Sequence, residues 1–287
     1  MELTIKGHSG CDIQVAREGK EIVVYKSTGD PKYAPRLINQ ARKQQQAGVY
    51  EYQHIRVPVI FDVKQDDKGA FIKMEYVYSK NFVEYFEHAG FEQIKYLIRA
   101  LEYFLEKEIS ASETSIIKSS ILTDKFADVK KKTLSNKALE GDKKVVELIE
   151  KSEKIFDNIG DMEMPVGRCH GDLTFSNILF NGNNYYLIDF LDSFIESPML
   201  DIVKLRQDTA YRWSQLMYTK AFDDIRLRIV FEKIDKEIDE YFRTKYDWYA
   251  KYYQPLQLMN FLRIIQYAHD PIVINYLKNT ISSLQND

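Results

Sequence analysis

Short runs in which apolar and polar residues alternate fill the first quarter of the chain. Four of these runs have the length and composition of β-strands, at residues 11–16, 21–26, 57–63 and 70–77. Polar turns at residues 17–20 and 65–69 join them in pairs, which favours two antiparallel hairpins. Between the pairs, Leu37, Ile38 and Ala41 lie one helical turn apart and predict a single helix. This part should therefore form a small antiparallel α+β unit.

Beyond residue 78 the apolar period becomes helical. Three helical series occur, around residues 94–105, 145–156 and 227–242, and Gly160 is a plausible stop after the second. A strand-and-loop block, 165–192, lies between the second and third series. At 287 residues the chain is long enough for a two-lobed unit. We expect an α+β fold with lobes 1–77 and 78–287, the second mostly helical.

Composition narrows the function classes. Apolar residues make up 45% and charged residues 29%, as in ordinary soluble proteins, and the net charge of −3 gives no electrostatic reason to expect nucleic acid or an anionic membrane as partner. No run approaches the roughly 20 apolar residues of a membrane span. Cys11 and Cys169 are too few for a disulfide framework, and the first residues lack the apolar core of a signal peptide. We therefore expect a cytoplasmic location.

Candidate chemistry is concentrated in residues 168–192, RCHGDLTFSNILFNGNNYYLIDFLD. Asp172, Asn177 and Asp189 stand out as polar residues in an apolar setting. Two short strands around the turn-forming residues 181–184 would return Asp189 toward Asn177. One carboxylate and one amide oxygen suit Mg²⁺ that carries ATP phosphates, because Mg²⁺ rarely uses an all-protein cage. Asp172 would then face an attacking hydroxyl.

The run H-G-D-x-x-x-x-N followed by I-D-F resembles the catalytic block of the aminoglycoside phosphotransferase and choline kinase group, which shares its two-lobed fold with protein kinases. An isolated HGD triplet carries little weight, but the Asn and the later Asp at these offsets make the match specific. The resemblance implies Asp172 as catalytic base, Asn177 and Asp189 as magnesium ligands, and His170 as a brace for the loop. It also implies ATP as cofactor and a small hydroxyl compound as acceptor.

The first lobe contains the further parts that this resemblance implies, in the right order. Gly7, Ser9 and Gly10 resemble the family's G-x-S-G loop, in which glycines and a hydroxyl approach phosphate closely. Lys26 ends a predicted strand, where the resemblance places the lysine that reaches the α and β phosphates. A lysine at a strand end is normally a solvated charge, so the assignment depends on this order.

The segment MEYV resembles the hinge that holds adenine, with the Glu75 carbonyl and the Val77 amide as partners and Met74 as a pocket wall. Met74 is equally compatible with a role as core filler. One departure from the pattern concerns the helix. Kinases usually pair the strand lysine with a helix glutamate, yet residues 31–50 contain no acidic residue, and Gln40 stands near that position. Either Gln40 bonds Lys26 as a neutral partner, or Asp189 and phosphate hold Lys26 alone.

The residues after Asp189 bear on the acceptor. Asp192 is a candidate for a second magnesium or for the acceptor, or else a turn carboxylate, and Asp201 is expected to be a buried carboxylate that accepts N–H bonds from the catalytic loop. Only a short segment separates Asp189 from Pro198, whereas protein kinases have a long one there to dock a polypeptide. Gly171 also stands where protein kinases have arginine. Both features favour a small acceptor.

The acceptor site should lie in the helical lobe, which is rich in aromatic and acidic residues near its end: Asp208, Tyr211, Trp213, Asp247, Trp248, Tyr249, Tyr252, Tyr253, Tyr267 and Asp270. Such residues would suit a quaternary ammonium, an amino sugar or a neutral sugar, but they fit ordinary half-buried helices better. Amino alcohols, aminoglycosides and sugar or glycan units all stay open. The alternative function is a pseudokinase that binds nucleotide and acts as a regulatory or scaffold protein.

Overall fold

The computed structural model describes residues 3–6 and 11–286, and the chain divides into two compact, discontinuous units. The first unit comprises Met1–Lys107, His170–Ser193 and Ala221–Val230, and the second comprises Glu108–Cys169, Phe194–Lys220 and Phe231–Asp287. The lobe boundary expected between residues 77 and 78 falls inside the first unit and stays a prediction.

A five-stranded antiparallel sheet forms the main part of the first unit, in the order β1-β2-β3-β6-β5. Its strands are β1 (Leu3–Lys6), β2 (Asp12–Glu18), β3 (Glu21–Thr28), β5 (Ile60–Asp66) and β6 (Gly69–Glu75). Both predicted hairpins are present. The first turn is shorter than predicted, because Glu18 pairs with Glu21 and only Gly19 and Lys20 form the loop. Gly19 adopts the left-handed φ of 61°, which glycine tolerates without strain.

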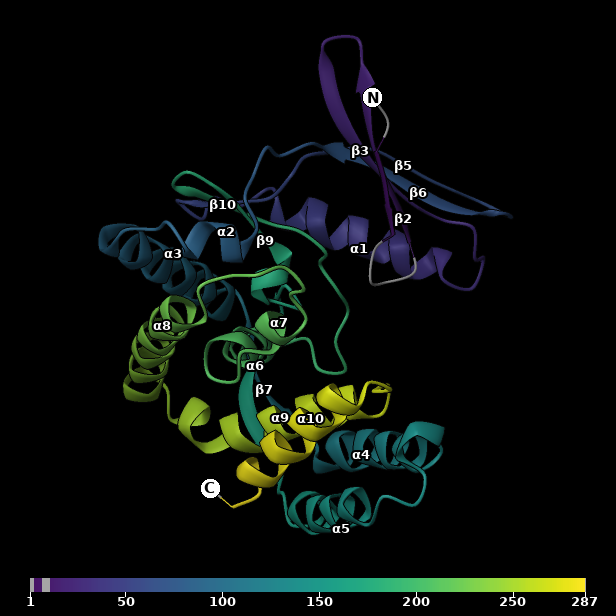
Figure 1. Cartoon of the computed structure of the whole chain (residues 1–287), viewed down its shortest axis with the longest axis vertical. Helices are drawn as coiled ribbons and strands as arrows, with labels where there is room; N and C mark the ends of the chain where they lie inside the picture. The colour runs from purple at the N-terminus through teal and green to yellow at the C-terminus, as the bar shows by residue number, and fades with distance from the viewer. Residues whose placement is uncertain (1–2, 7–10, 287) are drawn as a thin grey trace. The chain divides into compact units, whose positions relative to one another are not determined.

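Helix α1 (Ala34–Ala47) packs on β3, β5 and β6 (Figure 1). A proline lies in its first turn, where the missing N–H costs nothing. Its apolar face joins one core with the sheet, formed by Cys11, Ala34, Leu37, Ala41, Ala70, Ile72 and Met74. Gln40 and Gln44 are buried on the helix as well. A buried amide needs a hydrogen-bond partner, so this helix meets the rest of the unit through polar contacts as well as apolar ones.

The predicted strand-and-loop block, 165–192, contributes two of the three strands of the second sheet of the first unit, which is ordered β4-β10-β9. Its strands are β4 (Ile55–Arg56), β9 (Ile178–Asn181) and β10 (Asn184–Leu187), and the neighbouring elements are α2 (Phe82–Phe86), α3 (Phe91–Ser110) and the 3₁₀ turn η2 (Phe175–Asn177). The predicted β9–β10 hairpin is confirmed by its register, Asn181 against Asn184. Phe86 lies 5.1 Å from Phe175 and 5.5 Å from Phe180, centroid to centroid, so aromatic packing holds α2 against β9 and the turn before it.

The second unit is mostly helical, as predicted, around the two-stranded pair β7–β8. Its elements are β7 (Glu113–Ile117), α4 (Ser119–Leu134), η1 (Lys137–Leu139), α5 (Lys143–Asp157), β8 (Met162–Val166), α6 (Pro198–Thr209), α7 (Trp213–Leu216), the greater part of α8 (Asp224–Lys245), α9 (Asp247–Ile265) and α10 (Pro271–Leu284). The three predicted helical series correspond to α3, α5 and α8. Helices α4, α6, α9 and α10 were not predicted. Helix α6 is buried on almost every side and α9 over more than half of its residues, so neither shows the polar face that produces a helical period.

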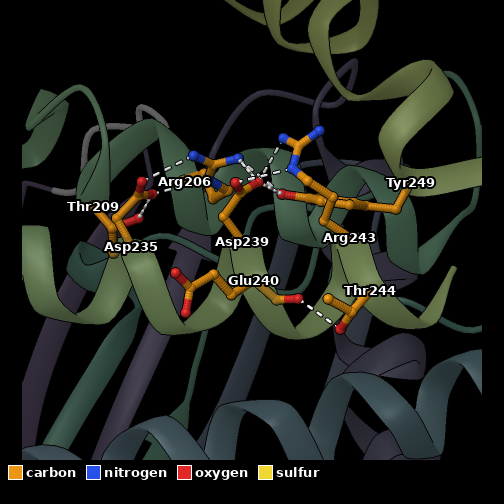
Figure 2. A network of polar contacts seen from close by, with 8 residues as sticks. All are labelled: Arg206, Thr209, Asp235, Asp239, Glu240, Arg243, Thr244 and Tyr249. Carbon is orange, nitrogen blue, oxygen red and sulfur yellow. Dashed lines mark hydrogen bonds and ion pairs between the residues drawn. The ribbon is translucent and has the colours of Figure 1, made fainter. Parts of the chain in front are cut away.

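A buried arginine fastens three helices of the second unit together (Figure 2). Arg206 of α6 donates two hydrogen bonds of 2.8 Å to the Asp235 carboxylate, and its other terminal nitrogen reaches Asp239 and the Tyr249 hydroxyl. The guanidinium also lies 4.2 Å from the centroid of the Tyr253 ring. Because the charges are largely removed from water, loss of the arginine would leave the Asp235 carboxylate without its cation, typically a loss of about 3–5 kcal/mol, whereas Asp239 would keep Arg243 as partner.

Candidate active site

His170 lies at the start of the HGD run, and its side chain is fully buried. Its Nε2 lies 2.8 Å from the Ile188 carbonyl, and its Nδ1 accepts the Asp172 N–H at 3.1 Å. An amide can only donate, so Nδ1 is the acceptor and Nε2 carries the proton. Burial lowers the pKa of His170 to about 4. The ring therefore ties the segment of Asp172 to the segment just before Asp189.

Asp172 and Asn177 are held together by the turn that follows the HGD run. The Asn177 side-chain amide donates to the Asp172 backbone carbonyl at 2.8 Å and to the Asp172 carboxylate at 3.0 Å. Thr174 N–H also donates to the Asp172 carbonyl, which closes the turn. These bonds use the nitrogen of the Asn177 amide and direct its oxygen to the other side, where it is a suitable ligand for a hard cation.

Asp189 lies two residues beyond β10, and the hairpin returns it to Asn177 as expected. The β9–β10 pairing continues past the strands, since Ile188 N–H donates to the Asn177 carbonyl at 3.0 Å. Asp189 then turns into the left-handed region with φ 61°, an uncommon conformation for a residue other than glycine. Backbone strain of this kind is concentrated at functional sites.

Lys26 connects the main sheet to this loop. Its Nζ lies 2.6 Å from Asp189 Oδ1 and 3.2 Å from Gln40 Oε1, and the side chain is 5% exposed. Of the two possibilities that the sequence left open for Lys26, the first is realised: Gln40 is a neutral partner, so Asp189, the anionic partner, does not hold Lys26 alone. Gln40 is itself oriented by Tyr33, whose hydroxyl accepts from Gln40 Nε2 at 3.3 Å.

The segment expected to form the hinge, residues 74–77, consists of the last two residues of β6 and the two that follow it. Met74 and Val77 are buried, while Tyr78, the next residue, is largely exposed. Glu75 pairs its N–H with the Val59 carbonyl at 2.8 Å, and its carboxylate accepts the Val59 N–H at 3.1 Å. These two hydrogen bonds fix the end of β6 against the residue that precedes β5. The expected contacts of the Glu75 carbonyl and the Val77 amide with adenine stay predictions.

The remaining predicted residues have different outcomes. The phosphate-loop residues lie outside the described part of the chain: Gly7, Ser9 and Gly10. Asp192 is exposed, three residues after Asp189. Asp201 is fully buried in the first turn of α6, which Ser197 caps by accepting the Met199 N–H at 3.1 Å. Asp201 belongs to the second unit, and its expected bonds to the catalytic loop stay a prediction.

Two features of the site were missed by the sequence. Lys43 of α1 donates from Nζ to the Leu191 carbonyl at 2.6 Å. Gly171, which the sequence singled out only for its difference from protein kinases, has φ 87°, and a Cβ there would lie 1.9 Å from the Leu191 oxygen. The helical spacing of Lys43 from Gln40 was the one available signal. The contact itself joins residues far apart in the sequence.

Among the candidate acceptor residues of the second unit, Tyr249, Tyr252 and Tyr253 are buried, so their rings are core rather than surface. Within residues 3–6 and 11–286, no three His, Cys, Asp or Glu side chains are grouped so that they could hold a metal ion. In the same part of the chain, none of the helices combines the length and the apolar character needed to cross a membrane.

The main sheet with its single helix, the HGD turn and the lysine–aspartate pair together define a kinase-like phosphotransferase. The family model described as "Phosphotransferase enzyme family" matches residues 52–232, well over half of the chain. The chain therefore belongs to the phosphotransferase enzyme family and is a small-molecule kinase. A search of curated proteins gave no match.

Solved structures show the same fold. A thermostable mutant of the aminoglycoside phosphotransferase APH(4)-Ia, in a ternary complex with AMP-PNP and hygromycin B, aligns with a TM-score of 0.68 at 8% identity over 100% of this chain and 93% of that chain. The GDP and kanamycin complex of APH(2")-IIia gives 0.65 at 12% over 100% and 93%. The type VIII aminoglycoside-3'-phosphotransferase gives 0.53 at 15% over 89% and 92%. At these identities the likeness concerns the fold.

Proposed function

We propose that this protein transfers the γ-phosphate of Mg²⁺-bound ATP to a hydroxyl of a small molecule, with Asp172 as the catalytic base. The observation that supports this most is the grouping of four polar side chains within the first unit. Lys26 contacts Asp189, the residue before Asp189 donates its N–H to the Asn177 carbonyl, and Asn177 donates to Asp172. A positioned base, two oxygen ligands and a lysine are the parts that phosphoryl transfer requires.

In this mechanism Asp172 orients the acceptor hydroxyl and accepts its proton as the new O–P bond forms. The bond between the γ-phosphorus and the oxygen that it shares with the β-phosphate breaks, and ADP leaves with the electron pair of that bond. Asn177 and Asp189 would hold Mg²⁺, which neutralises phosphate charge when it is bound. One amide oxygen and one carboxylate would suit this ion, because Mg²⁺ in nucleotide sites is typically bound by only one or two protein groups. Lys26 would contact the phosphates from the sheet side.

The acceptor class is an amino alcohol, an aminoglycoside or a sugar or glycan unit. The structural neighbours are aminoglycoside phosphotransferases, and two of them were solved with hygromycin B or kanamycin. This supports testing aminoglycosides early, although the low identity gives no reason to exclude the other classes. A nucleotide cofactor is supported by the same neighbours, which were solved with AMP-PNP or GDP.

A pseudokinase is the second candidate, and the neutral Gln40 in place of an acidic helix residue is the observation that favours it. The complete set Asp172, Asn177 and Asp189 opposes it, because pseudokinases commonly lack the base or the metal ligands. The two functions differ in one measurable respect, since only the enzyme releases ADP when an acceptor is added.

The decisive experiment measures ADP release from Mg²⁺-ATP against a panel of amino alcohols, aminoglycosides and free sugars. Wild type should show an acceptor-dependent rate of roughly 1–100 s⁻¹, which Asp172→Asn should remove while ATP still binds. Asp67→Asn, in the exposed β5–β6 turn, is the matched control and should behave as wild type. ATP binding without turnover on any acceptor would support the pseudokinase instead.

The metal assignment has its own test. Asp189→Ala should remove the Mg²⁺ dependence of nucleotide affinity, measured by calorimetry with and without Mg²⁺. If the variant binds Mg²⁺-ATP as tightly as wild type does, Asp189 is not a metal ligand.

A further inference from the structure

The face of α1 that packs on the first unit carries polar residues at helical spacing. Gln40 bonds Lys26, and Gln44 donates to the Pro58 carbonyl at 2.9 Å. Lys43 lies on the same side, and its ammonium donates to the carbonyl of Leu191 at 2.6 Å, 148 positions further along the chain. A hydrogen bond from a charged ammonium to a main-chain carbonyl is stronger than a neutral one. Because the carbonyl is part of the backbone, this bond holds the position of the backbone segment itself.

Leu191 joins the two segments that carry the proposed chemistry. Its N–H donates to the His170 carbonyl at 2.9 Å, while its own carbonyl accepts from Lys43. His170 lies two residues before Asp172, and Leu191 lies two residues after Asp189. The spacing between the base and the metal-binding carboxylate is therefore set at this peptide. Lys43 is the contact that fixes the peptide to α1.

The ammonium also lies beside the peptide that leads into Asp172. A Cβ on Gly171 would be 3.3 Å from Lys43 Nζ and 1.9 Å from the Leu191 oxygen. Lys43, Gly171 and Leu191 are thus mutually close, and the lack of a side chain at Gly171 is what allows that approach. The ammonium thus bonds one segment and lies close to the other.

We propose that Lys43 is a positioning residue, whose ammonium holds the Asp189–Leu191 segment and the His170–Asp172 turn in register and ties both to α1. A helix without an acidic residue cannot make the usual carboxylate-to-lysine link. Here a cation on the helix bonds the catalytic backbone directly. The effect on turnover rests on the proposed function, whereas the effect on the order of the Leu191 peptide does not.

The test compares Lys43→Met, Lys43→Arg and, as matched control, Arg42→Met, which removes an equal charge from an exposed position on the same helix. The first measurement is hydrogen exchange in the nucleotide-free protein, for a peptide that contains the Leu191 amide. Lys43→Met should raise its exchange rate about tenfold or more, Lys43→Arg by less, and Arg42→Met not at all.

The second measurement separates kcat from KM for Mg²⁺-ATP, using the best acceptor or, failing one, water. Because a displacement of about 1 Å in reacting groups costs on the order of 100-fold, kcat should fall roughly 10- to 100-fold in Lys43→Met, while KM changes less than about threefold. Lys43→Arg should restore part of this loss, which a purely structural defect would not do.

Unchanged exchange at the Leu191 peptide in Lys43→Met would overturn the inference whether or not the protein is an active kinase. So would an active wild type whose kcat the substitution leaves intact, or an arginine variant no better than the methionine one. If the wild type shows no turnover with any acceptor, including water, the proposed function is refuted instead. The role of Lys43 is then decided by the exchange comparison alone.

Discussion

Replacement of Gly171 by alanine probes the contact on which the site geometry depends. The added Cβ would lie 1.9 Å from the Leu191 oxygen, whereas real Cβ contacts are essentially never below 3.0 Å, so one of the two backbones must move by about 1 Å. That movement strains the 2.9 Å bond from Leu191 to His170 and the 2.6 Å bond from Lys43. The methyl group cannot be accommodated by rotation, because a main-chain carbonyl is the obstacle.

The expected loss of stability has two parts. A left-handed φ costs an alanine about 1–2 kcal/mol, and weakening of a buried backbone hydrogen bond adds about 1–3 kcal/mol. Urea denaturation of Gly171→Ala should therefore show a free energy of unfolding about 2–5 kcal/mol lower than that of wild type. Turnover per folded molecule should fall about 100-fold, since Asp172 follows directly and a 1 Å misplacement has an effect of that size.

Two further glycines separate the contributions. Gly182→Ala meets no atom within 4 Å at φ 58°, so it should lose only the conformational part and keep its turnover. Gly69→Ala meets the Thr28 oxygen at 1.9 Å but changes the first residue of β6, outside the candidate site, so it should lose stability while its folded fraction stays active. The reasoning is refuted if Gly171→Ala folds and turns over within about twofold of wild type, or if Gly69→Ala loses turnover equally.

Two other outcomes are expected. In Gln40→Glu the carboxylate should pair with Lys26 more strongly than the neutral amide does, which leaves Asp189 freer to bind the metal. KM for Mg²⁺-ATP should therefore fall about fivefold, corresponding to about 1 kcal/mol. Steady-state kinetics check this, with the exposed Gln45→Glu as control, and an unchanged KM contradicts it. Burial keeps the pKa of His170 in the folded protein at about 4, below the usual 6.5. As the pH falls, the unfolded chain therefore binds the proton first. The free energy of unfolding should fall by about 3 kcal/mol between about pH 6.5 and pH 4. Urea denaturation at stepwise pH should show this slope in wild type and a shallower one in His170→Gln; equal slopes would rule His170 out as its source.

The elements that the sequence predicted are those whose pattern is local. Both hairpins and the helix that carries Leu37 and Ala41 follow from alternation and spacing within about ten residues. Helix α9 was not predicted from the sequence, because its tyrosines are buried together with most of its apolar residues. A helix with most of its residues buried shows little contrast between an apolar and a polar face, and this contrast is what the pattern depends on.

The site divides in the same way. Asp172, Asn177 and Asp189 could be selected as candidates because they lie within one short block and match a motif. The contact between Lys43 and Leu191 was not found, because nothing in the local sequence of either residue indicates the other. The bond from Gln40 to Lys26 was left open for a related reason, since an amide side chain accepts partners of many kinds and its position alone does not select one.

The charges of the site suggest why a neutral Gln40 is tolerated. In the nucleotide-free protein Lys26 is matched by Asp189 at 2.6 Å, with the Gln40 oxygen as a second acceptor. In the proposed function ATP supplies phosphate oxygens for Lys26 and Mg²⁺ supplies a cation for Asp189, so the pair can separate without leaving either charge uncompensated. ATP alone would satisfy Lys26 but place its phosphates near a carboxylate, and Mg²⁺ alone would leave the lysine without an anion. Nucleotide and metal should therefore bind as linked events, and the linkage should weaken when Gln40→Glu gives Lys26 an anionic partner of its own.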